Sequence, residues 1–414
     1  MSRPHTSPPV PRIPRRLALV TLLAAAGLVV LPSCGGGGGG DGGGGATGGG
    51  GTAGLDTGGT GSFSSGAISG FGSVIVNGVR FEDNTARIAD EDDETKVLTP
   101  QDLRLGMVVR VQGGTITAGS GDVLPSAAAT AITVESQIKG PVESKTGTDT
   151  LVVFGQTVKV NAATVFEAGV SFASIVVGNA LEVHGFADAT GAVTASRIER
   201  EGSPSEFKLR GFISNHDAGA KTFQIGTATF NYASASRLPS TALANGVFVR
   251  VRTRGIVKNA NGQWIAERID LRSAVEDRNE AEVEGILVQT GTVFSVNGLT
   301  VDVSRLAAGT AAALVGRRVE IEGSIANGVL VARTIKLEDE NDQAKVDVRG
   351  TASSVNKTAQ TFVVRDLTFH YSSITQEKDG TIATGLTDGA NIRVRGTLPI
   401  GGGNIEATEI DFTP

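Results

Sequence analysis

The chain has 414 residues, of which 57 are glycine, 19% are charged and 5% are aromatic, and its formal net charge is −6. A chain of this length exceeds what one hydrophobic core usually organises, so we expect several domains. The acidic balance argues against nucleic acid and anionic headgroups as partners, because phosphate binding needs a basic face.

Residues 1–33 have the features of a secretory signal peptide. Arg12, Arg15 and Arg16 precede an apolar run over residues 17–31, which is the order of a basic region and an apolar region in such signals. The run is too short for a comfortable membrane span. It leads directly to Cys34, the only cysteine, so no intramolecular disulfide can form.

The segment Leu31-Pro32-Ser33-Cys34 resembles the lipobox of bacterial lipoproteins, in which a lipid is attached to the cysteine and the preceding segment is removed. The resemblance implies lipidation of Cys34 and a membrane anchor. Gly35 after the cysteine favours, by the same resemblance, the outer membrane, with the protein facing the periplasm or the surface. The alternative is an ordinary secretory signal followed by a chance cysteine.

Residues 34–65 predict a flexible tether. Of the 27 residues 35–61, 18 are glycine, and such a segment cannot bury a core. A glycine-rich phosphate-binding loop would need an adjoining strand and helix and a Lys-Ser/Thr pair. No such features adjoin the glycine-rich segment.

The rest of the chain carries one sequence pattern five times. A glycine precedes an alternating strand that usually ends in a second glycine, as in Gly316-Arg-Arg-Val-Glu-Ile-Glu-Gly323, and the repeat closes with Ala-x-x-Ile, as in 332–335. The leading glycines lie 68 to 73 residues apart. A fixed period of this kind indicates one supersecondary unit in tandem. The third copy ends in Thr253 instead of glycine.

Each repeat predicts five strands with a short helix before the fourth. Asn-Gly pairs at 77–78 and 297–298 predict hairpins. Segments 99–106, 239–246 and 310–316 are typical of a short helix that ends in glycine. This order is that of a small OB-like β-barrel, with a curled, unclosed sheet as the alternative.

We therefore predict an all-β chain of five tandem OB-like barrels, at residues 66–136, 137–205, 206–280, 281–343 and 344–414. Alternation places Val319, Ile321, Ile392 and Val394 in the cores and directs Arg318, Glu320 and Glu322 to water. Short joints predict a string of barrels with limited hinge freedom.

The pattern resembles a bacterial repeat found in Gly-tethered lipoproteins, domain-of-unknown-function family 5666. The resemblance covers about residues 66–414 and rests on the Gly-x-x-V-x-V-x-G strand and the Ala-x-x-Ile ending. Both are structural features. The family implies no catalytic residues.

Few residues suggest chemistry. His184, His216 and His370 fall in three different repeats, and we interpret each as a lone surface or half-buried histidine. No nucleophile elbow is present and the only thiol is the predicted lipid site. We therefore expect a non-enzymatic protein without a cofactor.

An acidic run over residues 90–94 is the densest in the chain. Asp90, Asp92, Asp93 and Glu94 are weak candidates for binding Ca²⁺, although EF-hand spacing is absent and a charged loop tip is far commoner.

Aromatic residues that could stack on a ligand are scarce. Trp264, Tyr232 and Tyr371 are the only Trp and Tyr, which gives little support to a face for nucleic acid or oligosaccharide. We expect core or edge packing for Trp264.

Our first hypothesis is a cell-envelope lipoprotein whose barrels act as a structural scaffold or interaction module for another envelope protein or polymer. The alternative is a binding module for a small ligand, a metal ion or a glycan at the barrel rims.

Overall fold

The computed structural model describes residues 61–92, 96–120, 123–272, 274–338, 345–399 and 401–412. The predicted signal peptide and Cys34 lie outside these ranges. No helix within them has the length and apolar character needed to cross a bilayer.

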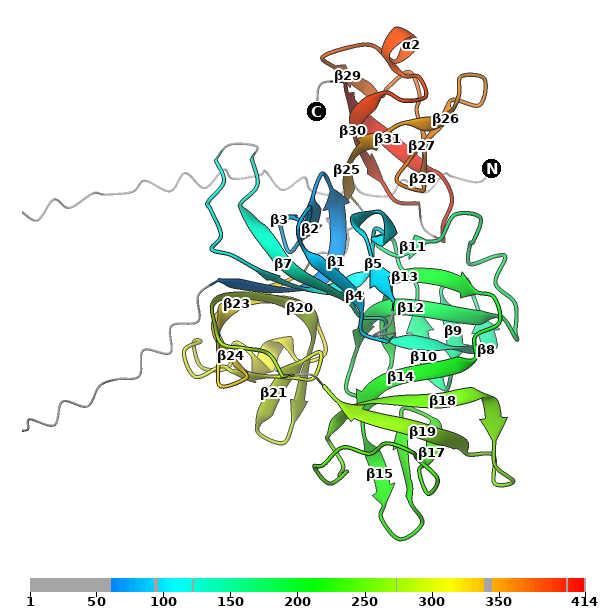
Figure 1. The fold of residues 1–414 in the computed structure, drawn as a ribbon, viewed down its shortest axis with the longest axis vertical. Helices are drawn as coiled ribbons and strands as arrows, with labels where there is room; N and C mark the ends of the chain where they lie inside the picture. The colour runs from blue at the N-terminus through cyan, green and yellow to red at the C-terminus, as the bar shows by residue number, and fades with distance from the viewer. Residues whose placement is uncertain are drawn as a thin grey trace, which may run out of the picture. The chain divides into compact units, whose positions relative to one another are not determined.

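The described residues form five small barrels, coloured in turn from blue to red in Figure 1. Barrel 1 contains β1 (Ser62–Phe71), β2 (Val74–Val76), β3 (Val79–Glu82), β4 (Arg87–Asp90), β5 (Val97–Leu98), β6 (Val108–Gly113) and β7 (Ser126–Val134). Barrel 2 contains β8 (Ile138–Thr146), β9 (Thr150–Val153), β10 (Gln156–Lys159), β11 (Val165–Phe166), β12 (Ala180–Ala187) and β13 (Val193–Glu201). Barrel 3 contains β14 (Glu206–Phe212), β15 (Ser214–Asp217), β16 (Thr222–Ile225), β17 (Ala228–Asn231), β18 (Phe248–Lys258) and β19 (Trp264–Leu271). Barrel 4 contains β20 (Arg278–Thr290), β21 (Val293–Val296), β22 (Leu299–Asp302), β23 (Arg318–Ala326) and β24 (Val329–Leu337). Barrel 5 contains β25 (Lys345–Thr351), β26 (Ser353–Asn356), β27 (Thr361–Val364), β28 (Leu367–His370), β29 (Gln376–Lys378), β30 (Asn391–Thr397) and β31 (Ile405–Asp411).

The main strands pair in the same order in every barrel. In barrel 4, β20 runs antiparallel to β21 and to β23, β23 runs antiparallel to β24, and β22 runs parallel to β24. The corresponding parallel pairs in the other barrels are β3 with β7, β10 with β13, β17 with β19 and β28 with β31. In barrels 3 and 5 the separate strands β15 and β26 follow the first strand and pair with the next strand along the chain. The predicted all-β fold of five small closed barrels is confirmed.

The glycine that leads into the fourth strand has a backbone conformation that other residues rarely adopt. Its φ lies between 78° and 91° in all five barrels, at Gly106, Gly178, Gly246, Gly316 and Gly389. A left-handed backbone costs a residue with a Cβ roughly 1–2 kcal/mol. The repeated glycine is therefore explained by the turn into this strand.

The closing glycine and the Ala-x-x-Ile sequence meet at one β-bulge. In barrel 4 the register between β23 and β24 shifts between Glu322 and Gly323, and Gly323 faces Ala332. A Cβ on Gly323 would lie 2.1 Å from the carbonyl oxygen of Val331. The same shift occurs in the other four barrels, at Thr253 in barrel 3. Because a bulge bends the sheet and increases its twist, both sequence signatures serve barrel closure.

Short helices precede the fourth strand in three barrels: η1 (Pro100–Asp102), η2 (Ala312–Leu314) and α2 (Ile382–Gly385). The predicted helix over 239–246 is wrong, since that segment forms turns and bends. Nucleating a helix fixes several residues for one hydrogen bond, so a segment this short follows its surroundings.

The predicted core positions are confirmed. Val319, Ile321, Ile392 and Val394 are fully buried. The prediction that Arg318 faces water is wrong, because its side chain is only 9% exposed and its guanidinium lies 4.7 Å from the ring centre of Phe186 in barrel 2.

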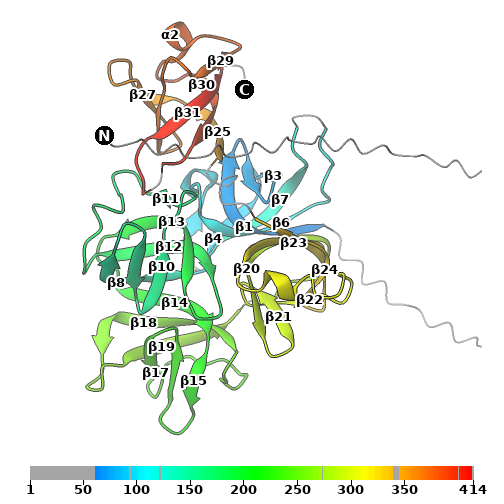
Figure 2. The same ribbon diagram turned by 180° about the vertical axis from the view of Figure 1, so that it is seen from behind.

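Barrels join through their first strands. Residues 62–65 of β1 pair in parallel with β20, and residues 70–71 pair in parallel with β25. Barrel 1 therefore contacts both barrel 4 and barrel 5 (Figure 1). Barrels 2 and 3 join through antiparallel pairing of β8 with β14, and their strands lie side by side in Figure 2. The expected string of barrels is wrong, because repeats that are distant in sequence share strand edges.

The strand β1 begins at Ser62, inside the range predicted for the tether. Phe63 is 2% exposed and belongs to the core of barrel 4. These residues are ordered because each pairs on one side with β6 and on the other with β20.

Candidate functional site

The larger cavities in the described part of the molecule lie between barrels. One of about 390 Å³ is lined by barrels 1, 2 and 5, and another of about 350 Å³ is lined by barrels 1, 2, 4 and 5. Apolar side chains fill the barrel interiors. A small ligand would therefore find its space at the joints of the assembly.

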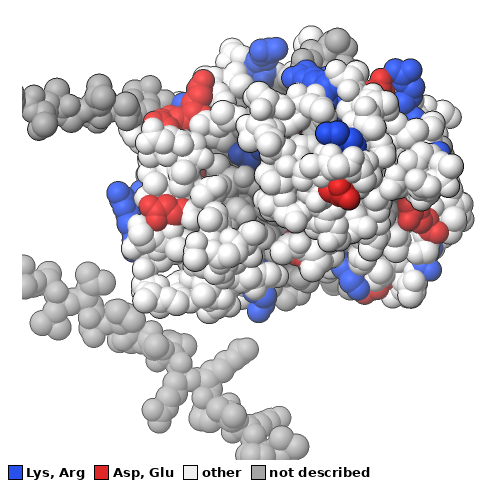
Figure 3. Space-filling view, turned by 90° about the horizontal axis from the view of Figure 1, so that it is seen from below, with Lys and Arg blue, Asp and Glu red and all other residues white. Residues whose placement is uncertain are grey.

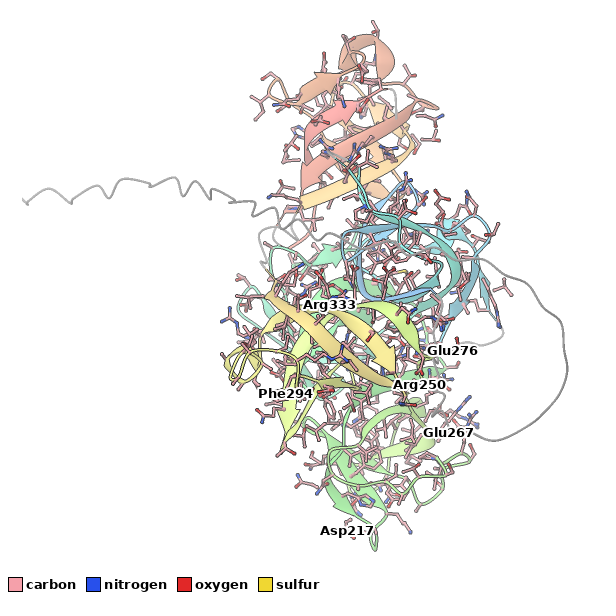
Figure 4. All side chains as sticks on the ribbon, turned by 90° about the vertical axis from the view of Figure 1, so that its left-hand side faces the viewer. Asp217, Arg250, Glu267, Glu276, Phe294 and Arg333 are labelled. Atoms are coloured by element: carbon pink, nitrogen blue, oxygen red, sulfur yellow. The ribbon has the colours of Figure 1, made fainter. Side chains whose placement is uncertain are left out.

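Barrel 3 presents four cations to barrel 1. Lys208 and Arg210 on β14 lie directly opposite Arg252 and Arg250 on β18. Like charges in this arrangement repel each other, and side chains of all four are at most 11% exposed. Barrel 3 therefore needs acidic partners on this face. In Figure 4, Arg250 lies away from Asp217, the last residue of β15, which is near the bottom of the picture.

Barrel 1 supplies those partners from the acidic run and from the end of β7. Asp92 forms an ion pair with Lys208 and lies 3.5 Å from Arg250. Glu91 forms an ion pair with Arg210. We call these acids and the four cations of barrel 3, together with Glu135 and Arg110 of barrel 1, the ionic joint.

The joint also includes a third acid and a cation of barrel 1. Glu135 contacts Arg110 at 2.6 Å and Arg210 at 3.3 Å. The backbone carbonyl of Glu91 accepts a hydrogen bond of 2.8 Å from Arg250. Ion pairs therefore connect barrels 1 and 3, although about 120 residues separate Glu91 from Arg210 in sequence.

The calcium candidates are placed as follows. Asp90 ends β4 and accepts a 2.8 Å hydrogen bond from the backbone N–H of Asp92. Asp92 belongs to the ionic joint, whereas Asp93 and Glu94 lie outside the described residues. In the described ranges, no three His, Cys, Asp or Glu residues are grouped as a metal site requires. Calcium binding by this run stays a prediction.

The three histidines have different surroundings. His184 is fully buried, so its interpretation as a surface or half-buried residue is wrong. Barrel 1 covers it, since its Nδ1 lies 3.1 Å from the carbonyl oxygen of Glu135. His216 contacts the hydroxyl of Tyr232 at 2.9 Å, and His370 contacts Glu406 at 3.0 Å. These two are only partly buried, as expected.

The larger cavity lies over the outer face of β12 and β13, and we call it the acidic cavity. Its lining includes seven acidic and three basic residues together with His184: Asp90, Asp102, Glu167, Glu182, Glu199, Glu201, Asp366, Lys96, Arg104 and Arg197. Glu182 faces Glu199 across the two strands, and His184 faces Arg197. Adjacent strands therefore bring charged residues of distant sequence positions together.

Ion pairs neutralise part of this charge. Arg197 is 1% exposed and lies 2.7 Å from Glu199. Burial acts to raise the pKa of Glu199, but the Arg197 guanidinium, through its charge and its hydrogen bond, acts together with Arg104 and other neighbouring groups to hold that pKa below its usual value. Burial raises the pKa of Glu201, and so does the hydrogen bond that its protonated form donates to the Glu182 carboxylate. Lys139 lies 3.4 Å from Glu182 and 3.1 Å from Glu201.

Sequence reasoning missed the acidic cavity. Its signal was an alternation of charged residues on two neighbouring strands, Glu182-Val-His184 and Arg197-Ile-Glu199. Such alternation ordinarily marks a face in water. Only the contact of barrel 1 with this face converts it into a cavity wall.

The Trp and Tyr side chains pack in cores. Trp264, Tyr232 and Tyr371 are at most 7% exposed, and the ring centre of Trp264 lies 4.6 Å from that of Phe154 in barrel 2. The expectation of core packing for Trp264 is confirmed. These rings are therefore not open platforms for stacking a base or a sugar.

The chain matches one family model in four places. The model, described as a domain of unknown function, DUF5666, matches residues 139–199, 210–270, 273–336 and 349–411. These ranges correspond to barrels 2 to 5, and barrel 1 lies outside them. A comparison with curated proteins gives no match. Since the four ranges cover more than half of the sequence, the chain belongs to the DUF5666 family.

Proposed function

We propose that the protein is a non-enzymatic lipoprotein of the cell envelope, whose barrels form a structural scaffold or interaction module. The observation that carries this proposal is the way barrel 1 joins the others. It shares strand edges with barrels 4 and 5 and buried ion pairs with barrel 3. Joints of this kind hold the outward surfaces of several barrels in one arrangement, which suits a protein that presents surfaces to a partner.

The surface in Figure 3 is compatible with such a role. On the face shown, acidic and basic side chains lie in small, scattered groups that are separated by uncharged residues. A face of this type fits another envelope protein or polymer better than a polyanion, because binding a phosphate backbone needs a continuous basic patch.

Replacing Cys34 tests the proposed lipid anchor. Labelling with a fatty acid is expected to mark the wild-type protein and to leave a Cys34→Ser variant unmarked. Fractionation then locates the labelled protein, and we expect it with the outer membrane. Label on Cys34→Ser would contradict the anchor without bearing on the fold.

The scaffold function is tested by cross-linking in cells followed by purification of the protein. We expect specific envelope components to be enriched with the wild type. A variant with an opened ionic joint, Glu91→Lys, is expected to lose those that contact more than one barrel. The control is Glu267→Lys, a half-buried site in barrel 3 whose ion-pair partner, Arg254, is exposed. Equal recovery with all three proteins would count against a function that depends on the barrel arrangement.

A further inference from the structure

The acidic cavity has the space, the charge and the hydrogen-bonding groups for a ligand of one chemical class. We propose that it binds a small organic polycation, a linear alkyl di- or polyamine, between barrels 1, 2 and 5. The proposal does not rest on the scaffold function, since it concerns a cavity of the isolated protein.

The first support is a buried histidine with a free nitrogen. His184 is fully buried, and its Nε2 is without a hydrogen-bond partner in the described part of the chain. A buried polar atom in this state costs free energy unless a ligand or water meets it. His184 is part of the cavity lining, so a ligand there can supply the missing bond.

The tautomer of His184 determines what kind of group it can receive. Nδ1 lies 3.1 Å from the carbonyl oxygen of Glu135 and 3.3 Å from the backbone nitrogen of Val108. In the shorter contact Nδ1–H donates to the carbonyl, which leaves Nε2 as an acceptor. Burial lowers the pKa of His184 and keeps it neutral. The open position therefore suits a donor such as an ammonium group.

The second support is the distribution of charge. Seven carboxylates and three cationic side chains line the cavity, so acids remain in excess even with Lys139 close behind Glu182 and Glu201. A cationic ligand would relieve the repulsion between the acids.

The size of the cavity favours an extended ligand over a single metal ion. A volume of about 390 Å³ corresponds to roughly a dozen water molecules at the volume each occupies in the liquid. The carboxylates are spread along the lining, and those described are not grouped as metal ligands. Apolar side chains of Leu98, Met107 and Val134 also line it. An alkyl chain can lie along these while its ammonium groups contact separate carboxylates.

The test uses the purified protein and spermidine in buffer of low ionic strength. Calorimetry is expected to show one spermidine bound per protein. Two variants, Glu182→Gln and Glu201→Gln, are expected to weaken binding by about tenfold each, because each removes a charged hydrogen-bond acceptor for an ammonium group. The control is Glu322→Gln, which removes a similar carboxylate paired with Lys336 in barrel 4 and is expected to leave the affinity unchanged.

A second measurement does not depend on the variants folding. In ¹⁵N NMR spectra of the wild type, spermidine is expected to shift the Nε2 resonance of His184 while those of His216 and His370 stay in place. An unmoved His184 resonance would overturn the proposal. So would spermidine binding equally to Glu201→Gln and the wild type, or Mg²⁺ binding with the same affinity and stoichiometry as spermidine.

Discussion

Barrel 3 is held by two joints of opposite chemistry. Toward barrel 2 the contact is apolar: Phe154 of barrel 2 packs against Phe207, Phe230 and Trp264 with ring centres 4.6 to 5.8 Å apart, and both barrels share one hydrophobic core. Toward barrel 1 the contact is the ionic joint. The two regions bury their side chains to a similar degree and differ in what the burial contributes.

Burying the aromatic rings stabilises the pair of barrels directly, because apolar area leaves water. Burying the ions costs solvation free energy that the ion pairs largely offset. An unpaired buried charge is therefore the main penalty at the ionic joint, and the pairs favour the one arrangement in which every charge meets its partner. The comparison indicates that the apolar joint supplies stability and the ionic joint supplies orientation.

The largest effect is expected at the apolar joint. Phe154→Ala should lower the free energy of unfolding by about 3–5 kcal/mol, since it removes a buried ring and leaves a cavity. Chemical denaturation monitored by circular dichroism measures the loss. The control is Phe294→Ala on β21, a partly buried position labelled in Figure 4, where a smaller loss is expected. Similar losses at both sites would show that the joint adds nothing beyond ordinary burial.

At the ionic joint, Glu91→Gln should cost about 2–3 kcal/mol, because Arg210 stays buried and loses one of the two carboxylates that pair with it among the described residues. Denaturation measures this loss too, and cross-linking between barrels 1 and 3 is expected to decrease. Glu267→Gln is the more solvent-accessible counterpart, since Glu267 is 33% exposed and its partner Arg254 is 81% exposed, and it should change stability by less than about 1 kcal/mol. An unchanged stability of Glu91→Gln would remove the orientation role of the joint.

The joint of barrel 1 with barrel 4 makes the stability of the folded protein depend on pH. Burial and the neighbouring Glu320 raise the pKa of Glu282 on β20 to about 7, and burial and Glu338 raise that of Glu320 to about 7. The folded protein thus holds protons that the unfolded chain releases near the ordinary glutamate pKa of 4.5, so stability falls as pH rises from about 4.5 to 7.

Glu282→Gln removes one of these groups. It should stabilise the protein at pH 8 by about 1–2 kcal/mol, after discounting the shift for partial exposure, and change little at pH 4. Thermal unfolding at both pH values measures the difference. A variant as unstable as the wild type at pH 8 would show that Glu282 ionises there without penalty.

The smallest effect is expected where the joints are not involved. Gly316 has φ +78°, and a Cβ there would meet no atom within 4 Å. Gly316→Ala should therefore cost only the backbone term, about 1 kcal/mol. Gly114 is also open but lacks a positive φ, so Gly114→Ala should be neutral or slightly stabilising. Calorimetric melting distinguishes the two, and equal effects would refute the role assigned to the leading glycine.

The sequence by itself determined the core positions and the main turns within each barrel. Alternation identified Val319 and Ile321 as core residues, and Asn77-Gly78 identified a hairpin whose two residues have φ of 50° and 75°. The leading glycines marked the turn into the fourth strand. These features depend on neighbours within a few residues, so local pattern was enough to predict them.

Only the tertiary structure decided which outward residues stay in water. Asp92, His184 and Arg318 occupy outward positions, and each is covered by a different barrel. Those contacts join residues that are tens to hundreds of positions apart, and the strands of every repeat follow the same alternation whether or not another barrel packs on them. The joints and the acidic cavity therefore depend on how five similar barrels fit together, because shape and charge complementarity between whole surfaces is not encoded in the period of any one strand.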